Sequence, residues 1–599
     1  MNIKLSHTHI ESFCGNVLPL YLECDSDISK AQIKWSTDNS DVVALRTFAG
    51  DDPFSFNHGV LLTLMKPGCA TVSAVLEGEA YKCEISVREM KRAQPGDKLE
   101  HFAGDLHDHT TKIHNHDDYA TRESEFQIDY INSVKEDGRL AFSVITDHVI
   151  VNNDRDFFRD FTDIELAEPN DITIIPGSEA VVDATSRDRY DLLYKTSGEI
   201  LVLNSNTYLF APTWEDFFTG MADSPFAVCV LCHPYGISNY YPGIGGFALE
   251  RNACPELQAL INGVEMGNGG IRSGNAVFEY VYSLALDNGF CVSPTSSSDC
   301  HGPKWGYDVW PGKTVIMAYE KSKEAFLDAL WARRFYATES GNIKLTYSVN
   351  GHTAPCTVPL TDTYKFHIEV SYFHDDPTTT PTVCRVMSDY GRILAEYRNV
   401  DFSSFDFEIK SNSARYFYLR FADEGKRRTW SVPVWTGRAF DEPQKTPPAP
   451  LDKTGFTAVE LESGKDASVL VCDDPRKPWS SELCTATYVI DMKKEQTFSA
   501  FGHYAPYEIR QELTKTGIAP HVALSRLVSR YELSESSDGI NYTKFCEGQI
   551  REFSGEEIIR FEPQKARYIK FRVISTTGAE WRHEFADSPI KIGELSVFE

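Results

Sequence analysis

The sequence predicts a multidomain protein in which a seven-unit β/α barrel is flanked by β-sandwich domains. The chain has 599 residues, and because domains usually contain about 100–200 residues, several domains are expected. Within residues 95–340, apolar strand-like runs alternate with helical stretches, which is typical of a largely parallel sheet covered by helices. On both sides of this segment, apolar and polar residues alternate with a period near two, which is typical of β-sandwiches.

Seven apolar runs define the predicted barrel, and most of them end in His, Asp, Glu or Asn. In parallel barrels, the residues of the functional site lie at the carboxyl ends of the strands. We therefore expect these polar residues to meet at one mouth of the barrel. The runs span residues 101–107, 140–148, 171–180, 198–206, 227–234, 261–269 and 291–302.

The segment before the barrel, residues 1–94, is expected to form a small β-sandwich. Short runs with alternating burial are broken by Gly, Asn and Asp, the residues that favour turns. Residues 35–45 and 66–75 resemble the bacterial immunoglobulin-like repeat found beside catalytic domains. This resemblance implies a structural module without chemistry of its own.

The segments after the barrel are also β-patterned. Residues 341–440 predict a second sandwich, and residues 441–454, rich in Pro, Lys and Asp, are typical of a linker. Residues 455–599 resemble the discoidin (coagulation factor C-type) sandwich, and this resemblance implies a carbohydrate or a lipid surface as a candidate partner. The matching pieces are residues 488–506, 531–545, 566–573 and 592–599. Candidate loop aromatics are Trp479, Tyr504 and Trp581, each of which is also compatible with an ordinary packing role.

The charge of the chain excludes some partners. With 59 Lys and Arg against 87 Asp and Glu, the net charge is −28, so nucleic acid is not expected as a partner. An anionic substrate would need a local positive charge, which bound cations supply. The sequence contains no apolar run of about 18 residues and no recognisable signal peptide, so we expect no transmembrane segment. A cytoplasmic protein is favoured, with secretion or the cell surface as the alternative if a signal was removed.

Histidines are concentrated where the barrel begins. Five of the 17 histidines fall between residues 101 and 116. His107 and His109 end the first run, and on a strand residues two apart face the same side, so both imidazoles can reach one ion. An isolated His-x-His pair is weak evidence for a metal site. His7 and His9 at the N-terminus form such a pair, and nothing else in the sequence supports a metal site there.

Later runs end in residues that complement this pair. Each of these endings alone is more typical of a turn or a satisfied core residue, but together they predict a mixed nitrogen and oxygen site for a divalent ion such as zinc, manganese or iron. The endings contain His148, Glu179, His233, Asp299 and His301.

In this order, the motifs GDLHDHT, ITDH, PGSE, CHP and SDCH resemble the PHP (polymerase and histidinol phosphatase) superfamily of metal-dependent phosphoesterases. The resemblance covers about 240 residues and implies a distorted seven-stranded β/α barrel that holds two or three divalent ions. It assigns one ion to His107, His109, Glu179 and Asp299, with Glu179 bridging to a second ion shared with His233. It assigns a third ion to His148, His301 and one of His114, His116 or Asp117, of which His114 is favoured.

Glu199 marks a departure from the family pattern. The resemblance implies a histidine ligand of the second ion at this position, whereas this chain has a carboxylate. A carboxylate also binds zinc or manganese, so the site can persist as a harder and more negative one. The alternative is a solvated Glu199 beside an emptier second site.

Other residues are candidates for supporting roles. Asp105 and Asp147 are expected either to orient ligand imidazoles or to cap strand ends. Arg272 and Lys313 are candidate contacts of a substrate phosphate, although both are also typical of ordinary surface cations. Cys229 and Cys232 are three residues apart and are expected in the core, with a metal or redox role as the alternative. If the substrate is a phosphate ester, His301 or Asp299 is the candidate that would protonate the leaving alcohol.

Three functions follow from these observations. The leading hypothesis is hydrolysis of a small-molecule phosphate ester by a metal-bound hydroxide, which forms near neutral pH because the ion lowers the pKa of its bound water. The second is hydrolysis of a carbon substrate, such as an ester or amide, with the same ions. The third, motivated by Glu199, is a glycan-binding protein with a degenerate barrel.

Overall fold

The computed structural model describes most of the chain, and the structural statements below concern these residues. The described residues are 3–24, 33–47, 58–91, 97–109, 140–147, 172–182, 198–205, 209, 211, 214–234, 255–269, 275–300, 312–411, 413–437, 448–474, 476–507, 525–551, 556–581 and 587–599.

The N-terminal segment forms two four-stranded sheets, with strand orders β1-β3-β6-β5 and β2-β8-β7-β4. Every second residue of β7 from Ala70 onward is buried, as its period-two pattern predicts. The strands are β1 (Ile3–Leu5), β2 (His9–Phe13), β3 (Val17–Cys24), β4 (Lys34–Thr37), β5 (Val43–Arg46), β6 (Gly59–Leu64), β7 (Gly68–Leu76) and β8 (Glu79–Arg88). This unit packs on the central part of the chain, where the ring of Phe13 lies 5.4 Å from that of Phe226.

Each of the seven expected apolar runs contains a strand, and the seven strands are neighbours in one sheet in the order β9 to β15. Four of the six pairings are parallel, but β12 runs antiparallel to both β11 and β13. The strands are β9 (Glu100–Asp108), β10 (Phe142–Ile145), β11 (Thr173–Val182), β12 (Gly198–Leu203), β13 (Val228–Leu231), β14 (Ile261–Asn268) and β15 (Ser293–Ser297).

The sheet forms a half-barrel, in which the chain just after β15 lies beside the end of β9. The Asp299 N–H donates to the His107 carbonyl oxygen at 2.9 Å, and the His109 N–H donates to the Cys300 carbonyl oxygen at 3.1 Å. The described helices of this region are α4 (Trp214–Met221), α6 (Pro255–Leu260), α7 (Asn275–Asp287) and α8 (Lys323–Trp331). The closed (β/α)7 barrel expected from the sequence stays a prediction, because the described residues show a half-barrel sheet.

The same sheet continues on the other side of β9 into the next expected domain. β9 pairs with β16 (Lys313–Ala318), then come β17 (Phe335–Thr338) and β26 (Arg428–Trp430). The expected boundary near residue 340 is therefore crossed by hydrogen-bonded strands, with Ala337 opposite Trp430. The path ends with β25 (Tyr416–Ala422), β22 (Val383–Ser388) and β23 (Ile393–Arg398), with β20 (Cys356–Val358) and β27 (Val434–Thr436) beside it.

A second sheet completes this sandwich and encloses an apolar core with the first. Its strand order is β19-β18-β21-β24, and Phe366, Ile368 and Phe417 are buried between the two sheets. The strands are β18 (Ile343–Val349), β19 (His352–Thr353), β21 (Thr363–Tyr372) and β24 (Phe405–Lys410).

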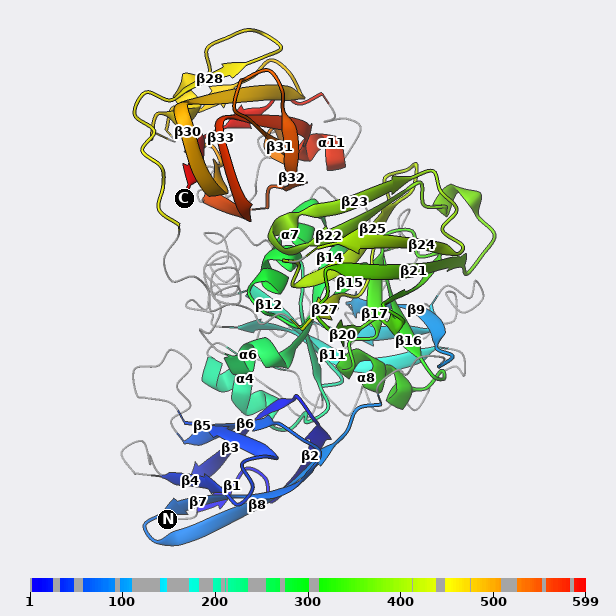
Figure 1. The fold of residues 1–599 in the computed structure, drawn as a ribbon. Coiled ribbons are helices and arrows are strands. Elements are labelled where there is room, and N and C mark those ends of the chain that lie inside the picture. Colours follow the sequence, from blue (N-terminus) through cyan, green and yellow to red (C-terminus); the bar gives the residue numbers. More distant parts are fainter. Residues whose placement is uncertain are drawn as a thin grey trace.

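The C-terminal segment forms a sheet of order β28-β30-β33-β31-β32, to which β35 adds beside β30. Figure 1 shows this unit and the N-terminal unit at opposite ends of the molecule, with the central sheet between them. The elements are β28 (Thr457–Glu460), β29 (Trp479–Ser480), β30 (Ala486–Tyr504), β31 (Val528–Ser536), β32 (Thr543–Gln549), β33 (Glu556–Thr576), α11 (Thr577–Trp581), β34 (Lys591–Ile592) and β35 (Glu594–Phe598). The three candidate loop aromatics therefore lie in β29, β30 and α11 rather than in loops. Among the helices of the described part, none is long and apolar enough to cross a membrane.

Candidate metal centre

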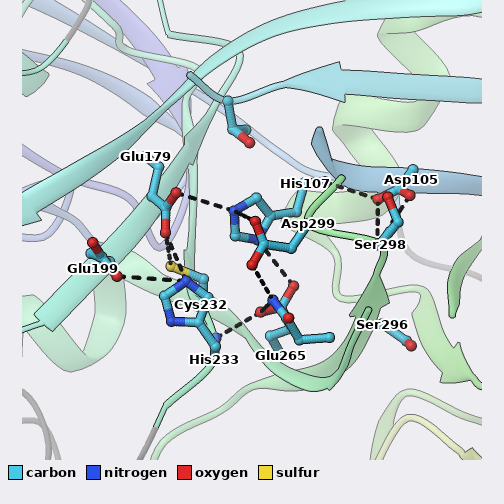
Figure 2. Close-up of polar contacts among 12 residues, drawn as sticks. Asp105, His107, Glu179, Glu199, Cys232, His233, Glu265, Ser296, Ser298 and Asp299 are labelled. Carbon is cyan, nitrogen blue, oxygen red and sulfur yellow. Dashed lines mark hydrogen bonds and ion pairs between the residues drawn. The ribbon is translucent and has the colours of Figure 1, made fainter. Parts of the chain in front are cut away.

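Polar side chains from six strands meet at the centre of the half-barrel (Figure 2). His107 lies near the end of β9, and His109 follows that strand directly. Their rings share one side, as expected for residues two apart, with centroids 5.0 Å from each other. The other side chains come from β11, β12 and β14 and from the residues just after β13 and β15: Glu179, Glu199, Glu265, His233 and Asp299.

A first group of potential ligands consists of His107, His109 and Asp299. Their ligand atoms all lie within 4.8 Å of one another. Asp299 Oδ1 lies 3.5 Å from His107 Nε2 and 3.2 Å from His109 Nε2. Both imidazoles are fully buried, so this carboxylate faces two nitrogen ligands in a site with little water around them.

A second group consists of His107, Glu179 and His233, and Glu179 joins it to the first. Glu179 Oε2 lies 3.2 Å from His107 Nε2 and 3.4 Å from His109 Nε2, whereas Oε1 lies 2.8 Å from His233 Nε2. The same carboxylate thus reaches all three imidazoles. Glu199 extends this second group, because its Oε2 lies 3.5 Å from His233 Nε2.

The electrostatics of the cluster favour bound positive charge. Burial alone would lower the pKa of His107, but the charges of Glu179, Asp299 and Glu265 outweigh it and raise this pKa well above its usual value. Burial likewise opposes protonation of His233, yet contacts with Glu179 and Glu199 raise its pKa to about 10.

The carboxyl groups respond to the same crowding. Burial and the neighbouring Glu179 raise the pKa of Glu199 to about 7. Burial would also raise the pKa of Asp299, but His107 and His109 lower it far below its usual value, so Asp299 is ionised.

These residues fit a divalent metal ion. Imidazole and carboxylate together form the donor set that zinc, manganese and iron accept, and a buried group of carboxylates calls for a compensating cation. Protons and metal ions compete for the same imidazole lone pairs, so the potential that raises the histidine pKa values also attracts a cation.

Sequence reasoning missed Glu265 and Asn268. Glu265 is fully buried in β14, and its Oε1 lies 3.2 Å from His107 Nδ1. A glutamate within the apolar run 261–269 was the available signal. Cys229 and Cys232 are both core residues, as expected, and the Sγ of Cys232 also lies 3.4 Å from Glu179 Oε1.

The supporting aspartates act through the backbone. Asp105 accepts hydrogen bonds from the backbone N–H groups of His107, at 3.1 Å, and Ser298, at 3.1 Å, so the contact to its neighbouring ligand is with the main chain rather than with a ring. Asp147 is fully buried, and its carbonyl oxygen accepts the Glu179 N–H at 3.2 Å.

Of the remaining predicted site residues, the structure describes Lys313. Lys313 is buried at the start of β16, where it pairs with Thr338 of β17, rather than exposed as a surface cation. The other candidates lie outside the described residues: His114, His116, Asp117, His148, Arg272 and His301.

The chain matches no protein-family model and no curated protein. Among solved structures, it is similar to a two-domain protein from Bacteroides vulgatus that contains a predicted PHP-like metal-dependent phosphoesterase, with 15% identity, 56% of this chain and 94% of that chain covered, and a TM-score of 0.29.

Two carbohydrate-binding modules from Clostridium perfringens are also similar to part of the chain. One is solved in complex with GalNAc-β-1,3-galactose, with 15% identity, 25% of this chain and 100% of that chain covered, and a TM-score of 0.20. The other is the family 32 module of NanJ in complex with galactose, with 18% identity, 25% of this chain and 98% of that chain covered, and a TM-score of 0.20.

Proposed function

We propose that this protein is a metal-dependent phosphoesterase whose site holds two or three divalent ions. The observation that carries the proposal is the position of Glu179, whose two oxygens face three imidazoles from two different segments of the chain. One ion would be held by His107, His109, Glu179 and Asp299. The second would be held by Glu179, Glu199 and His233.

The proposal extends to parts of the chain beyond this cluster. The half-barrel would belong to a distorted (β/α)7 barrel over residues 95–340, between sandwiches at residues 1–94, 341–440 and 455–599. A third ion would use His148 and His301, with His114 favoured over His116 and Asp117 as their companion. Arg272 and Lys313 stay candidates for binding the phosphate.

Divalent ions bound here would supply Lewis acidity towards a phosphoryl oxygen and would activate water as the nucleophile. They would also supply the positive charge that an anionic substrate needs in a chain with a net charge of −28. Glu179 would fix the spacing of the two ions. Because neighbouring imidazoles hold the pKa of Asp299 far below its usual value, Asp299 would act as a ligand, and protonation of the leaving alcohol would fall to His301.

The direct test is release of phosphate from a panel of phosphomonoesters. We expect turnover that a chelator abolishes and that added manganese or zinc restores. His107→Ala is expected to abolish turnover, because it removes a nitrogen that faces both groups of ligands. His367→Ala is the control, since His367 is exposed on β21 and should retain full activity.

Two results would contradict the proposal and favour a different function. Chelator-sensitive turnover of carboxylic esters or amides, with none of phosphates, would indicate the hydrolase of carbon substrates. Binding to a glycan array without any turnover would indicate a carbohydrate-binding protein with a degenerate site.

A further inference from the structure

Glu265 is not among the ligands proposed for either ion, yet it contacts two of them. Its side chain is fully buried in β14 beneath the candidate ligands. Oε1 lies 3.2 Å from His107 Nδ1, while Oε2 accepts the His233 backbone N–H at 2.6 Å and the Asn268 side-chain N–H at 3.1 Å. One carboxylate therefore contacts two candidate ligands from two other strands, one at its ring and the other at its backbone.

The contact with His107 orients that ring for metal binding. With an ion bound, a proton on Nδ1 would donate to Glu265 Oε1, and Nε2, which faces Glu179 Oε2 and Asp299 Oδ1, would offer its lone pair to the ion. A histidine that binds a metal usually donates its other ring N–H in this way, and the acceptor raises the basicity of the ligand nitrogen.

The contact with His233 holds backbone that is unfavourable on its own, and Asn268 links Glu265 to the side chain of Asp299. His233 has φ +26° and Asp299 has φ +49°, in the region that residues other than glycine rarely adopt. Glu265 holds the N–H of His233 directly. Asn268 connects Glu265 to Asp299, because its Nδ2 lies 3.1 Å from both Glu265 Oε2 and Asp299 Oδ2.

We propose that Glu265, together with Asn268, is a positioning residue that holds His107, His233 and Asp299 in the geometry that binds the ions. This inference rests on the proposed function, because it requires that the site binds metal. It predicts that Glu265 sets the affinity for the ions without being a ligand itself, so its loss weakens binding but leaves the number of ions unchanged.

The test compares Glu265→Gln with Glu339→Gln by titrating the metal-stripped full-length protein with manganese in a calorimeter. Glu339 is a matched control, since it is equally buried but contacts Arg428 outside the site, 3.1 Å from Arg428 Nη2. We expect Glu265→Gln to raise the Kd about 10- to 100-fold with the same number of ions at saturation, as loss of such partners does in other metal sites. Glu339→Gln should keep the wild-type Kd.

A spectroscopic readout separates positioning from a purely structural role. Cobalt(II) bound to the Glu265→Gln protein should show shifted visible absorption bands, because the ligand geometry changes, whereas cobalt in the Glu339→Gln protein should show the wild-type spectrum. A wild-type Kd together with a wild-type cobalt spectrum in Glu265→Gln would overturn the inference.

A second variant tests the inference if Glu265→Gln does not fold. Asn268→Leu removes the bridge to Asp299 at similar volume, and it should also raise the Kd; a wild-type Kd in this variant would then overturn the inference. If the unmodified protein binds neither manganese nor cobalt, the proposed function fails and the inference fails with it. If the wild type binds manganese and the variants keep the wild-type Kd, the inference about Glu265 fails while the proposed function stands.

Discussion

Glu179 lies where the two groups of candidate ligands meet, so under the proposed function its two oxygens would bind two ions at once. Replacing it by Gln removes the charge and leaves only one oxygen. We expect Glu179→Gln to lose both ions together, and metal analysis of the purified protein measures the loss. Loss of one ion with retention of the other would contradict the bridging role.

Glu199 contacts the second group through His233, with Oε2 3.5 Å from His233 Nε2. Glu199→Gln should weaken binding of the second ion at least about 10-fold, because even partners that do not touch the metal are worth 10- to 100-fold in affinity. The first ion should be unaffected. Stepwise titration with manganese measures both, and Glu199→His, which supplies a neutral ligand, should restore the second step. Equal weakening of both steps would show that Glu199 is not specific to the second ion.

At the residue scale, local sequence patterns predicted most of the candidate ligands that the structure brings together. His107 and His109 are two apart on a strand, and Glu179, His233 and Asp299 end or follow apolar runs. Glu265 could not be found in this way, because its partners His107 and His233 lie 158 and 32 residues away in the chain. Nothing near Glu265 in the sequence indicates which side chains it meets.

At the element scale, strand existence followed from apolar runs but strand direction did not. The run that forms β12 has the same composition as its neighbours, yet β12 is antiparallel to both. The pairing of β17 with β26 could not be predicted from the sequence either. It places Ala337 opposite Trp430, about 90 residues later, and the pattern of the intervening residues predicts a separate sandwich.

Helix α7 is the element that binds the central sheet to the segments after it. Asp287, at its end, accepts hydrogen bonds from Arg551 Nη1 at 2.5 Å, Arg415 Nη2 at 3.2 Å and the Tyr416 hydroxyl at 2.8 Å. Arg551 belongs to the C-terminal segment and Arg415 to the middle sandwich. The carboxylate of Asp287 therefore neutralises guanidinium groups from two other parts of the chain.

Asp287→Asn should lower the free energy of unfolding by about 1.5–3 kcal/mol, the usual contribution of hydrogen bonds to charged groups, because Arg551 keeps Glu557 and Arg415 keeps Asp389 as partners. Denaturant unfolding measures it. Asp406→Asn is the control, because Asp406 is exposed and pairs with exposed His367, and its effect should stay within about 0.5 kcal/mol. Equal effects of the two variants would contradict a docking role for α7.

At the scale of the whole molecule, a buried cluster of arginines and carboxylates joins the middle sandwich to the C-terminal unit. Arg385 Nε lies 2.6 Å from Glu396 Oε2 and its Nη1 3.6 Å from Glu580 Oε2, while Arg530 of β31 lies 3.1 Å from Glu396 Oε2. Burial would raise the pKa of Glu396 and of Glu580, but these arginines outweigh it and hold each pKa at about 2.

The depressed pKa values predict a loss of stability in acid. In the unfolded chain, a Glu titrates near 4.5, so the two groups stabilise the folded state fully above that pH and lose their contribution as the pH falls towards about 2. Arg385→Gln should therefore be less stable than the wild type at neutral pH, and the difference should shrink as the pH falls over this range. Denaturant unfolding at several pH values measures it, and a difference independent of pH would refute the coupling.

The convergence of His107, Glu179, His233 and Asp299 on bound metal is the claim on which the proposed function depends. Anomalous diffraction from crystals soaked in manganese or zinc tests it most directly. Two peaks are predicted, one between His107, His109 and Asp299 and the other beside His233 and Glu199, both about 2.0–2.2 Å from Glu179 oxygens. A map without a peak among these side chains, from crystals soaked with either ion, would contradict the account.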